Sequence, residues 1–182
     1  MAQTQRSIAD LYASIIPDNS ANLISAEDLR DAVETLRPRI GGYYFSSSAN
    51  TTINTISVYE LAAGTTAALA ANDSELTVSA SNRITYTGAA EVRAMVQVNV
   101  GIDINSGSQD IMGVWLYKNG SAITGAEIQN NIISSGRPDV FAIQVPVDLV
   151  TNDYLEIYVA NHAATSNIAI TMGTLTIITA PK

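Results

Sequence analysis

Few residues in this chain could carry out chemistry, and histidine is the scarcest of them. A Ser-His-Asp hydrolytic site needs a histidine that is oriented by a carboxylate. The single histidine, His162, stands in a stretch rich in Ala, Thr, Ser and Asn, with no acidic residue close to it in sequence. The pattern predicts a solvent-exposed loop histidine and no catalytic triad.

Carboxylates and thiols are the other chemical candidates. Asp148, Asp153 and Glu156 could in principle act as an acid and base pair, but they stand where turns and strand ends normally carry acids. The chain has no cysteine, which excludes disulfides, thiolate nucleophiles and Cys-ligated zinc. We therefore expect no enzyme activity and no cofactor.

The segment from Asp103 to Asp110 resembles a calcium-binding loop in its alternating oxygen-bearing side chains. An EF-hand requires Gly at its sixth position and Glu at its twelfth, where this chain has Ser108 and Val114. The expectation is that no metal is bound, with an irregular calcium site as the alternative.

Composition restricts the partners. The formal net charge is -8, and the nine Lys and Arg residues are scattered along the chain. Nucleic-acid binding draws on clustered basic residues, so a nucleic-acid partner is excluded, and an anionic membrane is disfavoured for the same reason. Charged residues make up only 14% of the chain. The surface must therefore be largely uncharged, which suits self-association.

The first 42 residues predict a helical arm of two short helices separated by a turn at Pro17–Ser20. A capping pattern at Ser25 begins the second helix, which Pro38 and the Gly41-Gly42 pair end. Such short helices are not stable alone in water, so their apolar stripes must pack on the β-domain, on sister chains or on a partner. The residues expected to carry docking or arm packing are Leu11, Ile15, Ile16, Leu29, Val33 and Leu36.

From residue 43 to residue 182 the hydrophobic period falls to two, which is typical of an all-β sandwich or barrel. Seven apolar residues alternate between Val92 and Ile104, and Asn119-Gly120 predicts a type I′ hairpin turn. A count of roughly eight strands favours an antiparallel jelly roll. The expected strands cover residues 52–61, 76–78, 83–86, 91–104, 111–118, 141–147, 154–160 and 168–179, with a return strand beginning at 122–123.

The order of these segments resembles the trimeric jelly roll of tumour necrosis factor and of the complement globular heads. The resemblance rests on Gly113–Gly120, Val145–Leu149 and Asn152–Val159, with Asn152-Asp153 standing where that family usually has Gly-Asp. It implies a homotrimer packed around an axis of aromatic and aliphatic residues. The candidates for that axis, which could alternatively fill each chain's own core, are Tyr43, Tyr44, Phe45, Tyr117, Tyr154 and Tyr158.

The arm has a resemblance of its own. Ile15–Asn19 followed by Leu23–Asp31 is similar to N-terminal segments of structural proteins of tailed bacteriophages. This resemblance implies a virion protein that is made in the host cytoplasm and placed on the capsid surface. The leading hypothesis is a trimeric decoration or cement protein that binds the major capsid protein through its arm.

Two other functions remain open at this point. One is the receptor-binding tip of a tail or head fibre, with loops 106–109 and 162–166 recognising a host glycan. The other is a cytokine-like or complement-like ligand head, against which the missing signal peptide, collagen stalk and cysteines count. The shortness of the chain favours decoration over a fibre, because no sustained heptad or repeat provides a stalk.

Overall fold

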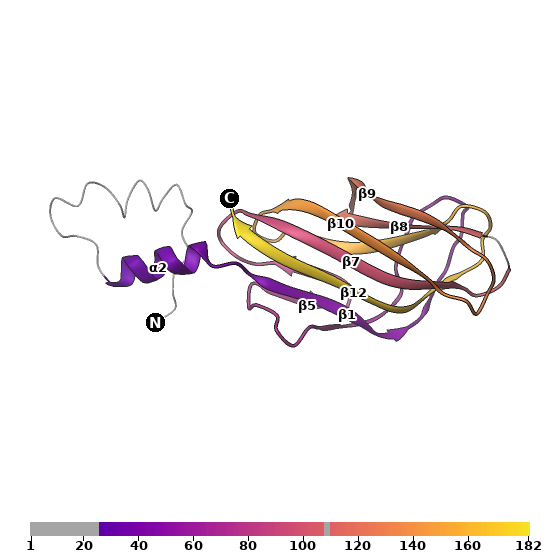
Figure 1. Cartoon of the computed structure of the whole chain (residues 1–182), viewed down its shortest axis with the longest axis horizontal. Helices are drawn as coiled ribbons and strands as arrows, with labels where there is room; N and C mark the ends of the chain where they lie inside the picture. The colour runs from indigo at the N-terminus through magenta and orange to yellow at the C-terminus, as the bar shows by residue number, and fades with distance from the viewer. Residues whose placement is uncertain (1–25, 108–109) are drawn as a thin grey trace.

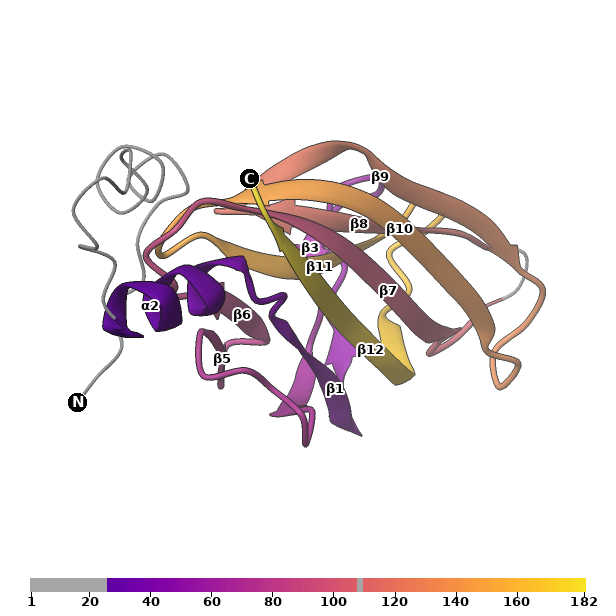
Figure 2. The same ribbon diagram turned by 60° about the vertical axis from the view of Figure 1, so that its left-hand side comes forward.

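The structure is a computed structural model that describes residues 26–107 and 110–182. It shows a sandwich of two antiparallel β-sheets, with helix α2 (Ala26–Leu36) projecting from one end beside the C-terminus (Figure 1). Figure 2 shows the two layers from a second direction, and the passage from α2 into the first strand. The mainly β fold is confirmed; the first expected helix lies outside the described residues.

One layer, which we call sheet A, has five strands in an antiparallel path, and the two-residue strand β2 (Asn50–Thr51) pairs with one of them. In spatial order the five are β10 (Asp139–Leu149), β7 (Val92–Ile104), β12 (Ile168–Pro181), β1 (Ile40–Ser48) and β4 (Gly64–Ala68).

The other layer, sheet B, has the same plan, with the short strand β3 (Glu60–Leu61) paired to β11. Its path runs through β5 (Leu76–Ser79), β6 (Arg83–Tyr86), β11 (Tyr154–Asn161), β8 (Asp110–Lys118) and β9 (Ser121–Ile132). Consecutive long strands from β7 to β12 cross between the sheets, except the hairpin β8–β9. This crossing is the connectivity of a jelly roll.

Alternating side chains fill the space between the sheets. The alternating face of β7, from Val92 to Ile104, is at most 5% exposed, as the period of two predicts. Facing residues of sheet B, such as Leu155 and Val159, are equally buried. Burying these apolar faces against each other is the main source of stability for such a sandwich.

Two turns take the conformations that their residues favour. Asn119 and Gly120 have φ of 53° and 73°, so the expected type I′ hairpin between β8 and β9 is present. Asn152 has φ of 72°, the left-handed conformation that Asn tolerates. Asn can therefore stand where the resembling family usually has Gly.

Two parts of the sandwich differ from the expectation. Strand β1 begins at Ile40, so the boundary expected at residues 42 and 43 lies too late in the chain. The strand expected over residues 52–61 is a loop up to β3. Its backbone forms no strand ladder: the Ser57 N–H donates to the carbonyl of Asn161 at the end of β11, and Ser57 has φ of 65°.

The turn before β11 holds a buried carboxylate that should affect how the stability of the fold changes at acid pH. Asp153 is 6% exposed; its carboxylate lies 2.7 Å from the Lys118 Nζ and accepts hydrogen bonds from Asn119 and from the Val150 N–H. Burial works to raise the pKa of Asp153, but the hydrogen bonds from Lys118, Val150 and Asn119 outweigh it and the pKa is lowered.

A lowered folded-state pKa makes Asp153 stabilising above the unfolded value near 3.9, and this contribution is lost as the pH falls below it. Asp153→Asn is expected to cost about 2 kcal/mol at pH 7 and to flatten the loss of stability below about pH 4. Urea unfolding at pH 7 and pH 3 measures both effects. If the variant and the unmodified chain lose the same free energy of unfolding between pH 7 and pH 3, Asp153 is not the source of this pH dependence.

No helix among residues 26–107 and 110–182 is long and apolar enough to cross a membrane.

Candidate interaction surfaces

The first two aromatic residues expected on a trimer axis lie inside their own chain. Tyr43 has no exposed surface, and Phe45, edge-on to it at 5.8 Å between ring centroids, is 9% exposed. Burial, with the nearby Glu156 carboxylate, holds the pKa of Tyr43 well above its usual range. The prediction is therefore corrected for these two residues, because a side chain enclosed by its own core has no surface to offer a neighbour.

Tyr44 points the opposite way, as alternation along a strand requires. It is 41% exposed and lies on the outer face of sheet A. The same face exposes most of the large hydrophobic side chains that the sandwich leaves open to solvent. They are Ile40 (51% exposed), Tyr44, Met95 (42%), Val140 (64%), Met172 (63%) and Ile178 (50%), and we call this surface the sheet A face.

Register joins these side chains into one surface. Ile40 pairs with Ile178, Ile178 pairs with Met95, and Met95 pairs with Pro146, which makes an apolar row across four strands. Strands β1, β4 and β12 contain no charged residue, and the charges of this face lie near the strand ends: Arg93 of β7 pairs with Asp148 of β10, and Asp103 lies near the other end of β7. A sheet face that meets only water normally carries charged side chains. The sheet A face is therefore expected to be covered by another protein surface.

Tyr117, Tyr154 and Tyr158 lie on the outer face of sheet B, on the far side of the sandwich from Tyr44. The rings of Tyr117 and Tyr158 stack at 3.9 Å, and the Arg83 guanidinium covers the Tyr154 ring at 3.7 Å. Arg83 also pairs with the buried carboxylate of Glu156, at 2.8 Å. The outer faces of both sheets cannot line the same trimer axis, so the six expected residues do not form a single interface.

His162 was expected in open solvent but is partly buried against sheet B. Its Nδ1 lies 3.1 Å from the Ser57 Oγ, and its Nε2 lies 3.3 Å from the Tyr59 hydroxyl, which donates to Glu127 at 2.6 Å. The hydrogen bond from Tyr59 is the main reason that the pKa of Glu127 is lowered. Gly113 makes room beneath, since a Cβ there would lie 2.2 Å from the Tyr59 hydroxyl. This chain of bonds holds the loop after β2 on the sheet.

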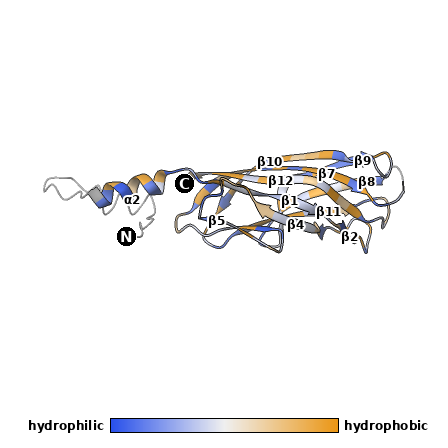
Figure 3. Ribbon diagram, turned by 90° about the horizontal axis from the view of Figure 1, so that it is seen from below, coloured by the Kyte–Doolittle hydropathy of each residue, from blue (hydrophilic) through white to orange (hydrophobic). Residues whose placement is uncertain are grey.

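Helix α2 exposes the apolar stripe that the sequence predicts. Leu29, Val33 and Leu36 are 60%, 62% and 52% exposed, whereas the polar residues Asp31 and Thr35 are buried. Figure 3 shows the hydrophobic residues gathered along one side of the helix. The α2 stripe, Leu29, Val33 and Leu36, is therefore not packed on its own sandwich. The other arm residues named above, Leu11, Ile15 and Ile16, lie outside the described residues.

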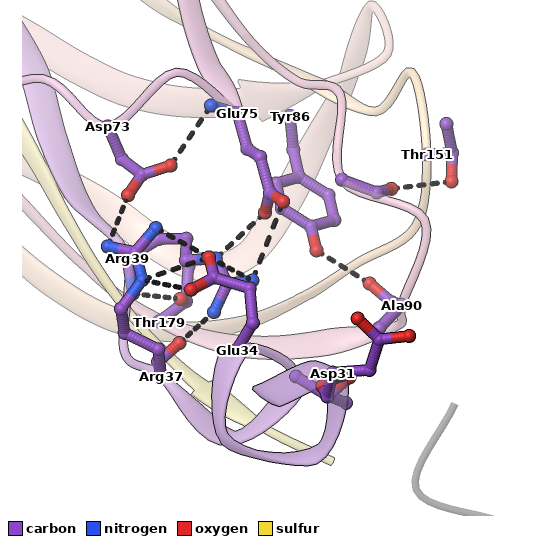
Figure 4. Close-up of polar contacts among 12 residues, drawn as sticks. Asp31, Glu34, Arg37, Arg39, Asp73, Glu75, Tyr86, Ala90, Thr151 and Thr179 are labelled. Carbon is purple, nitrogen blue, oxygen red and sulfur yellow. Dashed lines mark hydrogen bonds and ion pairs between the residues drawn. The ribbon is translucent and has the colours of Figure 1, made fainter. Parts of the chain in front are cut away.

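A buried arginine fixes α2 to the sandwich (Figure 4). Arg39 is 1% exposed; its Nε donates to the Glu75 carboxylate at 2.8 Å, and a second nitrogen lies 3.7 Å from the carboxylate of Glu34 in α2. Its backbone N–H donates to the Thr179 hydroxyl of β12 at 2.8 Å. Arg37 adds an ion pair with Asp73 at 2.7 Å. These bonds, which we call the Arg39 clamp, hold the end of α2 in place. The sequence did not suggest them.

The described residues of the two loops expected to recognise a glycan lie together, at the end of the sandwich opposite α2 (Figure 1). The Asn105 N–H donates to the Asn167 carbonyl at 2.9 Å, and a Cβ at Gly107 would lie 3.5 Å from the Ser166 Oγ. The loop between β9 and β10 joins them through a hydrogen bond from Ser135 to Gly107. A hollow of about 240 Å³ lies beside it, lined by Asn131, Ile133, Arg137, Pro138 and Asp139.

The acids of the calcium-like segment bond to protein groups. Asp103 accepts hydrogen bonds from the Gly136 N–H, and Asp110 accepts one from Asn161. In the part of the chain that the structure describes, no three His, Cys, Asp or Glu side chains gather in a way that could hold a metal ion.

By sequence, the chain matches no protein-family model and no curated protein. By structure, it is similar to the Eiger TNF of S. frugiperda, with a TM-score of 0.53 and 12% identity over 78% of this chain and 92% of that one. It is also similar to murine APRIL, crystallised at pH 8.5, with a TM-score of 0.52 and 8% identity over 77% of this chain and 98% of that one. At this identity the similarity is one of fold: the chain shares the jelly roll of these tumour-necrosis-factor-like structures.

Proposed function

We propose that the protein is a homotrimer held together through the sheet A face. The observation that carries the proposal is the row from Ile40 through Ile178 to Met95, exposed on a sheet whose strands β1, β4 and β12 contain no charged residue. Apolar surface of this extent marks an interface in a soluble protein. The resemblance to trimeric jelly rolls is the reason for three copies instead of two, and a closed cyclic assembly buries the same face in each chain.

We further propose that the trimer is a virion structural protein that decorates the capsid, with the major capsid protein as its partner. The resemblance of the arm to segments of phage structural proteins supports this, and so does the position of α2 at one end of the sandwich. Three arms on one trimer make contacts simultaneously, which raises the effective concentration of each arm at the capsid. Weak single contacts then suffice for lasting attachment.

The test has two parts. Sedimentation equilibrium of the full chain should give three times its mass of 19.2 kDa; a monomer at micromolar concentration would reject the trimer. Gold-labelled antibody on the source virion should then mark the head facets in electron micrographs. Label absent from the virion would reject decoration while leaving the trimer standing.

The corrected boundary changes how the arm itself is tested. Removing residues 1–42 would cut into β1 and the Arg39 clamp, whereas removing residues 1–25 leaves every described element intact. The shorter deletion is expected to keep a folded trimer that binds capsids at least tenfold more weakly. Full capsid binding by this variant would reject residues 1–25 as the anchor.

The receptor-binding tip is the second candidate, and one observation favours it. The two loops expected to recognise a glycan meet at the end opposite the arm, beside the hollow that Arg137 and Asp139 line. Such polar hollows suit sugar hydroxyl groups. Gold label confined to tail or fibre tips, together with glycan binding that Arg137→Ala abolishes, would favour this function over decoration.

A further inference from the structure

The α2 stripe has the spacing of a helix that packs against copies of itself. Leu29, Val33 and Leu36 are separated by four and then three residues within α2. Alternating steps of four and three make a narrow seam, which is the pattern of parallel helices in a coiled coil. A helix that lies on a sheet or on a broad surface normally shows a wider apolar face.

The stripe is also placed where sister copies would meet. Ile40, the first residue of β1, belongs to the apolar row of the sheet A face, where it pairs with Ile178. Only residues 37–39 separate the helix from that row. If three sandwiches join through their sheet A faces, the same contact surface leads directly onto the three helices.

The surface around the stripe fits a cyclic arrangement. On the helix, Arg30 lies on one side of the stripe and Asp28 on the other, because successive residues turn by about 100°. In a three-fold bundle each helix then turns its basic side toward the acidic side of the next. A hollow of about 270 Å³ beside Leu29 and Val33 has room for side chains of another helix.

We infer that the three α2 helices of the proposed trimer pack together through the α2 stripe as a short parallel bundle at the arm end of the head. The helix has 11 residues and would not associate alone. The trimer supplies the missing stability, because it holds the three helices at high effective concentration. The Arg39 clamp fixes their starting points.

Cysteine cross-linking tests the bundle directly, since the chain has no cysteine of its own. Val33→Cys in the full chain places one thiol on the seam, and Glu27→Cys places one on the opposite side of the same helix as the matched control. A short three-armed maleimide should join Val33→Cys into covalent trimers at least tenfold more efficiently than Glu27→Cys. Denaturing electrophoresis counts the joined chains.

The inference rests on the proposed trimer, so native mass is measured on the same samples. A native trimer in which Val33→Cys links no better than Glu27→Cys overturns the bundle and leaves the trimer intact. If Val33→Cys links only after residues 1–25 have been removed, those residues of its own chain cover the stripe, which also overturns it. A native monomer overturns both the bundle and the proposed function.

Discussion

Replacing Ile178 by arginine is expected to convert the trimer into folded monomers. Ile178 sits in the middle of the apolar row, paired with Ile40 on one side and Met95 on the other. In the trimer the guanidinium would be buried without a partner, a penalty of several kcal/mol for each ion. A cost of about 4 kcal/mol raises the dissociation constant roughly a thousandfold. Sedimentation equilibrium against protein concentration measures the change.

The single chain should tolerate this substitution, since Ile178 is already 50% exposed within it. An unchanged far-ultraviolet circular dichroism spectrum would show that the monomer is folded. Ile133→Arg is the matched control: the same exchange at a side chain that is 70% exposed but lies beyond the end of β9. If Ile178→Arg remains a trimer, or if Ile133→Arg dissociates as well, the sheet A face is not the interface.

Periodicity and turn chemistry were enough to predict the fold. The alternation along β7 identified its buried face, and Asn119-Gly120 identified the hairpin, because both signals are local. The prediction of a strand over residues 52–59 was wrong for the same reason, because the pattern that suggested it is also local. It is rich in β-branched residues, yet its backbone partners include residues distant in the chain, such as Asn161 at the end of β11, which no local pattern reveals.

The surfaces were harder to predict because they depend on which face each residue occupies. Tyr43 and Tyr44 are neighbours, and only the packed sandwich decides that the first is enclosed and the second is exposed. Tyr117 and Tyr158 looked like companions of Tyr44, but cross-strand register places them on the other sheet. A usable signal was present: β12 and β1 have no charged residue at their outward positions.

Breaking the Arg39 clamp is expected to destabilise the fold strongly. No sequence pattern indicated the clamp, because its partners are far apart in the chain. Glu75→Leu removes the carboxylate that lies 2.8 Å from the Arg39 Nε and leaves a guanidinium that is 1% exposed. Removing one partner of a buried ion pair costs about 3 kcal/mol or more. For a domain of this size, the melting temperature should fall by roughly 6 to 12 °C.

Adding Arg39→Met to Glu75→Leu should restore part of that loss, because the buried charge is then gone as well. The double variant is expected to recover about 2 kcal/mol over Glu75→Leu alone, since apolar side chains can fill the volume of a buried ion pair. Thermal and urea unfolding of both single variants and the double variant complete the cycle. A double variant no more stable than Glu75→Leu would mean that the Arg39 guanidinium acts through its hydrogen bond to the Arg37 carbonyl and not through its charge pair.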